Sequence, residues 1–349
     1  MNKEFDIITK LAKSLPRSPS QMNELFESDS EIIRYNDKNL LFTVDDYSAE
    51  DQIRDHDPYT LGWNLTAATL SDIFASGGIP LFYAHSLSIE PDKWDDRYIK
   101  EFSEGVSAVL KKAEAFFIGG DLGTSEKWHY TGIALGEAHE PITRKGAKEG
   151  DLILMSGQIG TGNLEAAFSL YSDKPLLKPI LKNVKNRFPV RLEESKLISK
   201  YATSCIDSSD GVLNALNTLA DINNTGYTIT ETPYLAGGLA ACKILSKPSE
   251  LLLLGECGEY ELVFTMDEKD KSKFLQTAKD QRLSFTIIGK MIAEPVKTLF
   301  SSGKHFDLTE FNIRARDYED VKVYLQSLTH YLKSHEKSDY VRTGNSHIR

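Results

Sequence analysis

Phe116-Phe117-Ile118-Gly119-Gly120-Asp121 is the stretch of the sequence that decides the fold. Its apolar half is short and favours β structure, so it predicts a buried strand. The two glycines allow a backbone or a phosphate to approach closely, and Asp121 stands where the chain is expected to leave the sheet. Ligands of α/β proteins bind at such strand ends. A strand followed by an ordinary turn explains the same residues, because Gly-Gly-Asp is a common turn composition.

The composition is typical of a soluble globular protein. A chain of 349 residues with 40% hydrophobic and 26% charged residues suggests two domains. Its formal net charge of −10 provides no electrostatic footprint for a nucleic-acid partner. No apolar run reaches the roughly 18 residues of a membrane helix, and the N-terminus has no basic-then-apolar layout. We therefore expect a cytoplasmic protein that binds neither nucleic acid nor membrane. Its three cysteines lack the CxxC spacing of a zinc site.

Helical and strand patterns alternate along the first half of the chain, which predicts an α/β (α+β) fold. The helical stripes fall at 2–15, 61–76 and 95–115, and the strand candidates at 40–44, 81–89, 116–120 and 130–138. A polar, turn-rich segment at 144–151 then separates an N-terminal domain of residues 1–148 from a C-terminal domain of residues 149–349. The C-terminal domain ends in a helical extension from about residue 312, with an apolar stripe between 317 and 334.

Carboxylates recur where the predicted elements end. Asp45 and Asp121 follow strands, Asp72 lies on the apolar side of a helix, and Asp207 and Asp210 precede another helix. Taken singly, the last two could cap a helix and Asp72 could pair with an arginine. If the groups converge, however, they cannot all stay ionised without cations. Mg²⁺ prefers carboxylate, water and phosphate oxygens, so it is the expected ion.

Such a cluster suits phosphoryl transfer, which requires positioning and charge neutralisation more than covalent help from the protein. No GxxxxGK[ST] loop is present, so the chain is not a P-loop kinase. The glycines at 157–162 read GxxGxG and miss the dinucleotide fingerprint GxGxxG. They indicate either a turn that cradles phosphate or a purely structural turn.

The ordered series of motifs resembles the thiamine-monophosphate kinases. These belong to the superfamily of aminoimidazole ribonucleotide synthetases, selenophosphate synthetases and hydrogenase-maturation dehydratases. The resemblance covers most of residues 4–310. It rests on six motifs in order: Thr43-Val44-Asp45, Leu70-Ser71-Asp72, Gly119-Gly120-Asp121, Arg144-Lys145-Gly146-Ala147 with Gly150-Asp151, Ile206-Asp207-Ser208-Ser209-Asp210-Gly211, and Tyr260-Glu261-Leu262-Val263-Phe264.

The resemblance implies a two-domain fold in which the N-terminal strands of two subunits pair across a homodimer. ATP and several Mg²⁺ ions would bind between the domains, and the γ-phosphate would pass directly to thiamine monophosphate to give thiamine diphosphate. The implied Mg²⁺ ligands are Asp29, Thr43, Asp45, Asp72, Asp121, Asp207 and Asp210. The implied ATP contacts are Gly120, Asp121, Arg144 and Ser209, and the implied substrate contacts are Gln52, Glu259 and Phe306.

The sequence departs from the family's pattern mainly on the acceptor side. Gln52-Ile53 stands where the family has a His-Phe pair, and the motif around Glu259 has a disturbed register. On the metal side, the family's Gly-Asp-Asp-Ala-Ala is replaced by Glu27-Ser28-Asp29-Ser30-Glu31, which keeps the second Asp. ATP use is therefore better supported than the identity of the acceptor.

Several alternatives stay open. The chain could be another ATP-dependent enzyme of this superfamily, a non-catalytic nucleotide-binding relative, or a metal-free structural protein. Two superfamily branches fit less well. Selenophosphate synthetases carry a reactive cysteine or selenocysteine near the start, whereas no cysteine precedes Cys205 here. Hydrogenase-maturation proteins end in a cysteine, whereas this sequence ends Ser346-His347-Ile348-Arg349.

Overall fold

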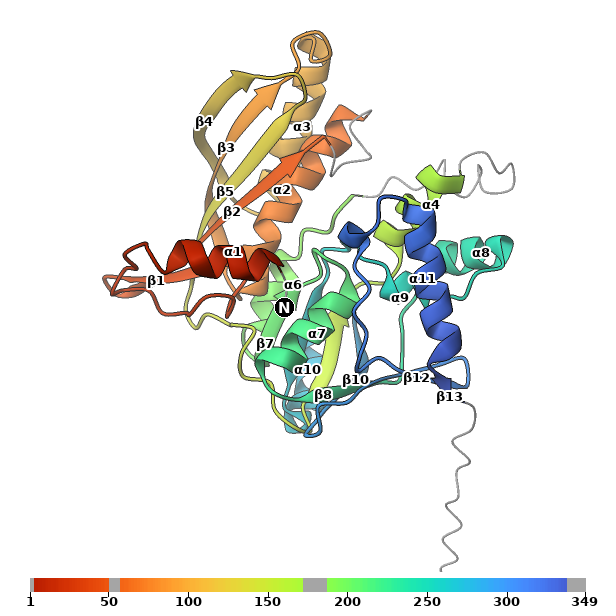
Figure 1. The fold of residues 1–349 in the computed structure, drawn as a ribbon. Helices are drawn as coiled ribbons and strands as arrows, with labels where there is room; N and C mark the ends of the chain where they lie inside the picture. Colours follow the sequence, from red (N-terminus) through yellow and green to blue (C-terminus); the bar gives the residue numbers. More distant parts are fainter. Residues whose placement is uncertain (1–2, 50–56, 172–186, 338–349) are drawn as a thin grey trace, which may run out of the picture.

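The computed structural model describes residues 3–49, 57–171 and 187–337 (Figure 1). Within these ranges the chain forms a five-stranded sheet from its first half and an eight-stranded sheet from its second half. The two sheets lie in separate lobes, and the N-terminal helix α1 (Lys3–Ala12) lies across the junction between them (Figure 1). This mixed α/β architecture with two sheets confirms the predicted fold class.

The first sheet has the strand order β1-β2-β5-β3-β4. Its strands are β1 (Glu31–Tyr35), β2 (Lys38–Ser48), β3 (Ile79–Ile89), β4 (Phe116–Thr124) and β5 (His129–Ala138). Helices α2 (Pro58–Ala75) and α3 (Asp96–Lys112) cover one face (Figure 1). Helix α2 is buried on nearly every side because it contacts the sheet, α3 and strand β7 (Ala202–Asp207) of the second lobe. It is therefore well placed to carry a site residue at the junction.

Strand β4 differs from the predicted buried strand. It is the edge strand, and the exposed fractions of Phe116, Ile118 and Leu122 are 70%, 64% and 68%. The Gly-Gly-Asp motif lies within the strand, so Asp121 does not follow it. An apolar run is equally compatible with a buried strand and with a strand whose partner surface lies on another molecule. Likewise, β2 runs beyond Asp45 to Ser48, so Asp45 and the next aspartate lie within a strand.

The second sheet has the order β13-β12-β11-β8-β10-β6-β9-β7. Its strands are β6 (Leu152–Ser156), β7 (Ala202–Asp207), β8 (Gly226–Ile229), β9 (Leu262–Met266), β10 (Phe285–Ile292), β11 (Lys297–Ser301), β12 (Lys304–Asp307) and β13 (Glu336–Lys337). Its helices are α4 (Thr161–Tyr171), α6 (Leu192–Ile198), α7 (Val212–Ile222), α8 (Ala236–Leu245), α9 (Leu251–Leu254), α10 (Lys271–Asp280) and α11 (Val321–Ser334), with short 3₁₀ turns at Glu268–Asp270 and Ala315–Asp317. The sequence patterns did not predict β1, β7, α8, α9, α10, β11, β12 or β13.

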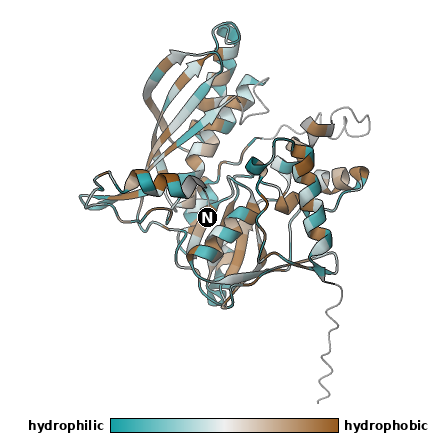
Figure 2. Ribbon diagram, in the orientation of Figure 1, coloured by the Kyte–Doolittle hydropathy of each residue, from teal (hydrophilic) through white to brown (hydrophobic). Residues whose placement is uncertain are grey.

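Two hydrophobic cores hold the elements together. The first runs from Leu41 and Leu65 of the first lobe to Leu154 and Phe264 of the second. The second core lies under α7, α9 and α11. Hydrophobic residues follow the strands of both sheets, whereas α11 carries hydrophobic and hydrophilic residues on different sides (Figure 2). The shared first core fixes the two lobes against each other at the place where the acidic residues meet.

The predicted C-terminal helix is confirmed and packs on the body of its own chain. Helix α11 begins after Asp320, whose side chain accepts a hydrogen bond from the Lys322 backbone N–H. Its apolar stripe joins the second core through Tyr324, Leu328 and Leu332. The C-terminal extension is therefore an integral part of the second lobe.

Candidate functional site

Three carboxylates converge at the junction of the lobes. Asp29, Asp72 and Asp207 each present one oxygen, and these oxygens lie within 4.8 Å of one another. Asp29 lies in the loop before β1, Asp72 on α2, and Asp207 at the end of β7. The sequence separates these residues widely. The packing of α2 against β7 brings Asp72 and Asp207 together, and the ion pair with Arg144 holds Asp29 beside them. Hard oxygen ligands at this spacing fit Mg²⁺.

The ionisation of the cluster is strongly perturbed. Burial raises the pKa of Asp45 to about 7, with a further contribution from the Asp207 charge. Burial also raises the pKa of Asp207 to about 6, with help from Asp29. The pKa of Asp72 lies well above its usual range, first through burial and then through Asp45. Asp45 therefore belongs electrostatically to the same cluster, and a cation there would relieve the repulsion.

Arg144 is the internal counter-ion of the cluster. Its Nη2 lies 2.7 Å from Asp29 Oδ1, and the exposed fractions of the two side chains are 20% and 2%. Its Nη1 donates to the Phe26 carbonyl at 3.3 Å, and its backbone N–H donates to the Glu27 carbonyl at 2.7 Å. The Nε of Arg144 is buried and has no hydrogen-bond partner among the described residues. This guanidinium therefore retains a donor for a ligand.

Two hydroxyl groups orient the carboxylates. Thr43 Oγ1 donates to Asp72 Oδ2 at 2.5 Å, and Ser209 Oγ donates to Asp207 Oδ1 at 2.7 Å. Helix α7 begins after Gly211 without a side-chain cap, so the alternative in which Asp207 or Asp210 caps this helix is wrong.

A polar cavity of about 250 Å³ opens beside the cluster. Four residues of the predicted site line it: Arg144, Asp207, Ser209 and Asp210. Arg314 and Arg316 line it as well, and the sequence interpretation missed both. The two arginines stand just before the helical stripe of the extension, so the only available signal was their basic Arg-x-Arg pattern.

Asp121 and Gly120 lie away from the cluster in the same subunit. Asp121 pairs in register with Ser86, Ser86 with Thr131, and Thr131 with Asp46. Three strand spacings therefore separate Asp121 from Asp46, the neighbour of Asp45 on β2, and this corresponds to roughly 14 Å. Position 120 requires glycine because of its packing on the neighbouring strand, since a Cβ there would lie 2.1 Å from the His85 carbonyl oxygen. The space beside Gly120 is thus filled by β3 of its own sheet.

Glu259 fills the turn formed by the glycine-rich stretch. Its carboxylate accepts hydrogen bonds from the backbone N–H groups of Gly160, Thr161 and Gly162 at 2.8, 2.9 and 3.1 Å. This is the arrangement in which helix N-termini bind anions. An internal carboxylate thus occupies the cradle that the sequence allowed for a phosphate.

The other two predicted substrate contacts fare differently. Phe306 lies in β12 with 3% of its surface exposed and belongs to the second core, so its prediction as a substrate contact is wrong. It faces the core because strand alternation points it inward. Gln52 lies outside the described residues.

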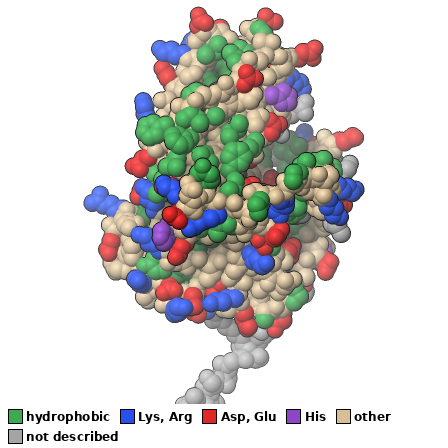
Figure 3. All heavy atoms as spheres, turned by 90° about the vertical axis from the view of Figure 1, so that its left-hand side faces the viewer, with side chains coloured by type: hydrophobic (Ala, Val, Ile, Leu, Met, Phe, Trp, Pro, Cys, Tyr) green, Lys and Arg blue, Asp and Glu red, His purple; other side chains and the backbone are tan. Residues whose placement is uncertain are grey.

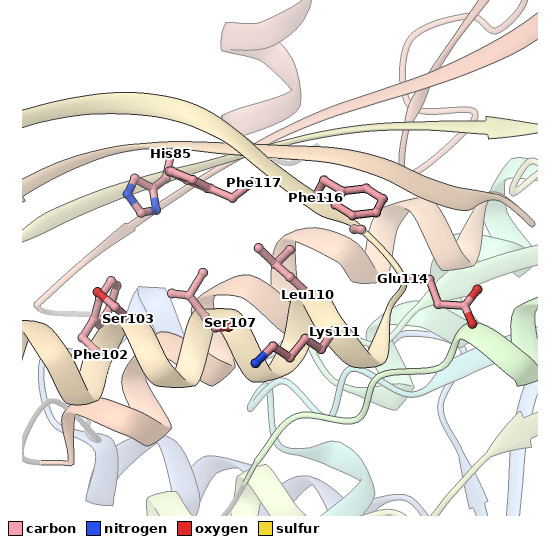
Figure 4. A pocket seen from close by; sticks show the side chains of 11 residues that line it. His85, Phe102, Ser103, Ser107, Leu110, Lys111, Glu114, Phe116 and Phe117 are labelled. Carbon is pink, nitrogen blue, oxygen red and sulfur yellow. The ribbon is translucent and has the colours of Figure 1, made fainter.

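A larger cavity of about 650 Å³ lies between α3 and the edge strand β4. His85 and Phe117 come from the sheet side, and Phe102, Ser103 and Ser107 face them from α3 (Figure 4). None of the predicted site residues that the structure describes lines this cavity.

Comparison with known proteins identifies the family. The model of the AIR synthase related protein N-terminal domain matches residues 27–138, and that of its C-terminal domain matches residues 148–301. The chain belongs to the AIR synthase related family. Within the described ranges of this AIR synthase related chain, no helix is long and apolar enough to cross a membrane.

The relatives of this AIR synthase related protein include several thiamine-monophosphate kinases. The thiamine-monophosphate kinase of Pyrococcus horikoshii is 28% identical over 77% of this chain and 84% of its own length. That of Aquifex aeolicus is 28% identical over 80% of this chain and 91% of its own length. The structure of AaThiL complexed with AMPPCP and TMP has a TM-score of 0.71 and 25% identity, covering 82% of this chain and 89% of that one.

Proposed function

We propose that the chain is a thiamine-monophosphate kinase, which transfers the γ-phosphate of ATP to the phosphate of thiamine monophosphate to form thiamine diphosphate and ADP. The observation that carries the proposal is the convergence of Asp29, Asp72 and Asp207 beside Arg144. The similarity to thiamine-monophosphate kinases over most of the chain supports it.

The residues of the cluster suit this reaction. Mg²⁺, when bound by the carboxylates, supplies neutralisation of phosphate charge. Thr43 and Ser209 hold two of the carboxylates in place through their hydroxyl groups. Arg144 has a buried Nε donor to offer a phosphate oxygen. Asp45 and Asp210 complete the proposed metal side.

We also propose a homodimer formed through the exposed apolar surface around β4. Hydrophobic side chains gather over the upper part of the molecular face in Figure 3. Phe116, Ile118 and Leu122 of β4 are exposed, as are Phe82 and Val44 of the same sheet. Large exposed apolar surfaces of this kind usually mark interaction sites. In such a dimer, Gly120 and Asp121 of one subunit would be available to the cluster of the other.

Mixed dimers test this arrangement. An Asp121→Asn chain and an Asp72→Asn chain are each expected to be inactive alone. If Asp121 serves the partner's site, subunit exchange between the two variants regenerates one intact site in each mixed dimer. Because half of the dimers in an equal mixture are mixed, the activity should reach about a quarter of the wild-type value. Each variant alone, taken through the same exchange procedure at the same total concentration, serves as the control. Absence of any regained activity after verified exchange would rule out the contribution across the interface.

The identity of the acceptor is tested by a substrate comparison. Purified protein with Mg²⁺ and ATP is offered thiamine monophosphate, unphosphorylated thiamine and other phosphate monoesters, and ADP and product formation are measured. We expect thiamine diphosphate from thiamine monophosphate only. Turnover of a different phosphate monoester would favour another enzyme of the family, and nucleotide binding without any turnover would favour a non-catalytic relative.

A further inference from the structure

The strand that carries Asp207 is anchored at its end by the buried residue Ser208. The pairing of β7 with β9 stops at Asp207, which lies opposite Leu262. Beyond that point, the Ser208 backbone N–H and the Ser208 Oγ both donate to the Glu261 carbonyl oxygen at 2.9 Å. The same Oγ accepts a hydrogen bond from the Glu261 backbone N–H at 2.9 Å. One hydroxyl group therefore binds both backbone groups of Glu261 and extends the pairing into the loop of the site.

The backbone conformation of Tyr260 explains why a hydroxyl group is used here. Tyr260 has a φ of 53°, so the chain turns sharply just before β9 begins at Leu262. A residue in this left-handed region interrupts the extended backbone of a strand. Within the described ranges, the Glu261 N–H has no acceptor other than the Ser208 hydroxyl. Since a buried N–H without a partner is costly, Ser208 stabilises this turn specifically.

Arg191 holds Glu261 from the side-chain end. The Nη2 and Nε of Arg191 lie 2.5 and 2.7 Å from the two oxygens of the Glu261 carboxylate. Ser156 Oγ donates to the Glu261 Oε2 at 2.6 Å. The exposed fractions of the Arg191 and Glu261 side chains are 21% and 9%. A bidentate ion pair fixes orientation as well as distance, so Glu261 is a rigid partner for Ser208.

The segment before this arginine fastens the same turn to the first lobe. The Phe188 backbone N–H donates to Asn64 Oδ1 at 2.8 Å, and the Phe188 carbonyl accepts from Trp63 Nε1 at 2.9 Å. Asn64 and Trp63 lie on α2, the helix that also carries Asp72. The Phe188 ring centre lies 4.0 Å from that of Tyr260. The turn that holds Ser208 is therefore tied to both lobes.

Ser208 links Asp207 to the residue that orients its carboxylate. The Asp207 Oδ1 accepts hydrogen bonds from the Ser209 N–H at 3.2 Å and from the Ser209 Oγ at 2.7 Å. The Asp207 Oδ2 is buried and has no hydrogen-bond partner in the described part of the chain. A buried oxygen of this kind requires a partner from outside the protein, and a cation provides one. A displacement of Ser208 would change the direction in which this oxygen points.

We propose that Ser208 and Glu261 are positioning residues of the metal site. Through their hydrogen bonds they align the Asp207 carboxylate with that of Asp72, and they raise the affinity for the divalent cation without being ligands of it. This inference rests on the proposed function, because it assumes that the acidic cluster binds Mg²⁺. Hydrogen bonds that orient a metal ligand typically account for about ten- to a hundredfold in metal affinity.

The test compares full-length Ser208→Ala with the control Ser204→Ala. Ser204 is also fully buried on β7, and its Oγ lies 2.7 Å from Thr265 Oγ1 of β9. Each variant thus removes one buried hydroxyl group between the same two strands, but only Ser208 reaches the loop of the site. Mn²⁺ stands in for Mg²⁺, because the two ions share a preference for carboxylate and water ligands. Electron paramagnetic resonance measures free Mn²⁺ in titrations of protein without nucleotide.

The two variants should differ in metal affinity and not in stability alone. Both should melt at a lower temperature than the wild type without ligand, because each loses a buried hydrogen bond. We expect Ser208→Ala to bind Mn²⁺ about tenfold or more weakly and Ser204→Ala to bind it like the wild type. Unchanged affinity in Ser208→Ala, an equal loss in Ser204→Ala, or no Mn²⁺ binding by the wild type would overturn the proposal.

Arg191→Lys provides a second, milder variant. It keeps the positive charge but replaces the planar fork with a single ammonium group, so Glu261 loses part of its fixed orientation. Mn²⁺ binding should weaken severalfold. If Ser208→Ala does not fold, this variant decides alone, and wild-type Mn²⁺ affinity in it would overturn the proposal. The titrations involve no turnover, so a wild type that binds Mn²⁺ but transfers no phosphate refutes the proposed function and leaves this test intact.

Discussion

Asp72 shows how a single residue can reveal a site. The carboxylate lies within the helix that is buried on nearly every side, where an unpaired charge is costly. Its pKa is raised well above the usual range, first by burial and then by Asp45, so the buried site disfavours the charged form of this carboxyl unless a cation is bound. Asn is nearly isosteric with the carboxyl group, carries no charge, and retains an oxygen acceptor for the Thr43 hydroxyl.

We therefore predict that Asp72→Asn leaves the free energy of unfolding without ligand within about 1 kcal/mol of the wild type. The stabilisation by Mg²⁺ and ATP should be lost, because a ligand of the metal is missing. Thermal unfolding with and without Mg²⁺-ATP measures both effects.

Asp151→Asn is the matched control, because Asp151 is a buried aspartate that accepts from Thr203 Oγ1 at 2.7 Å away from the cluster. It should lower stability by about 1–3 kcal/mol and keep the response to Mg²⁺-ATP. A normal Mg²⁺-ATP response in Asp72→Asn would remove Asp72 from the metal site.

Glu259 predicts a pH dependence of stability. Burial raises its pKa in the folded protein to about 7, although three backbone N–H groups favour the ionised form. Since this pKa lies above that of the unfolded chain, the folded state binds more protons between the two values. The contribution of Glu259 to stability is therefore full below the unfolded pKa and is lost as pH rises through about 7.

Glu259→Gln removes this titration while retaining a carbonyl oxygen as acceptor. Chemical denaturation between pH 5 and pH 8 should show a steeper decline for the wild type than for the variant. Parallel pH profiles for the two proteins would show that Glu259 does not titrate in this range.

At the residue scale, sequence and structure agree where a carboxylate conflicts with its surroundings. Asp72 stands out in an apolar helical stripe, and Asp207 belongs to one of the six motifs that follow the order found in the thiamine-monophosphate kinases. Phe306 and the arginines of the extension carried no such conflict. Whether an aromatic ring faces the core, or an arginine faces a cavity, depends on contacts between segments far apart in the sequence.

At the scale of elements, β4 is the informative case. Its apolar residues predicted a strand correctly but could not say that the strand would be an exposed edge. Hydrophobicity reports that a surface avoids water, and it does not report which chain provides the cover. The prediction that Asp121 stands at a strand end has a different cause, because glycine weakens a strand interior and Gly-Gly therefore suggested that the strand stops there.

We predict that Ile118→Glu disrupts the proposed dimer and leaves the subunit folded, because Ile118 is 64% exposed in the single chain. Sedimentation velocity should show a shift from dimer to monomer, and circular dichroism should be unchanged. Val323→Glu on α11 is the control, since Val323 is 47% exposed outside the β4 surface. A monomeric wild type, or a dimeric Ile118→Glu variant, would contradict the assignment of this surface.

At the scale of the whole molecule, the first core joins the two lobes. Leu41 and Leu65 belong to the same cluster as Leu154 and Phe264. A core shared in this way couples the unfolding of its parts. The site lies at this junction, so its geometry depends on both lobes. The chain length and the turn-rich segment at 144–151 predicted two domains, but the residues that join the two lobes could be found only from their packing.

We therefore predict a single calorimetric unfolding transition whose midpoint rises in Mg²⁺ and ATP. At a nucleotide concentration of 100 times the dissociation constant, the stabilisation should be about 2.7 kcal/mol. Two separated transitions, with only one responding to the ligand, would show that the lobes unfold independently.

The central claim is direct phosphoryl transfer between ATP and thiamine monophosphate at the acidic cluster. The most direct measurement supplies ATP labelled in its γ-phosphate, with Mg²⁺ and thiamine monophosphate, and follows the label. The account predicts that the label appears in the terminal phosphate of thiamine diphosphate in equal amount to ADP. Label released only as inorganic phosphate, or ATP left intact by folded protein that binds both substrates, would contradict it.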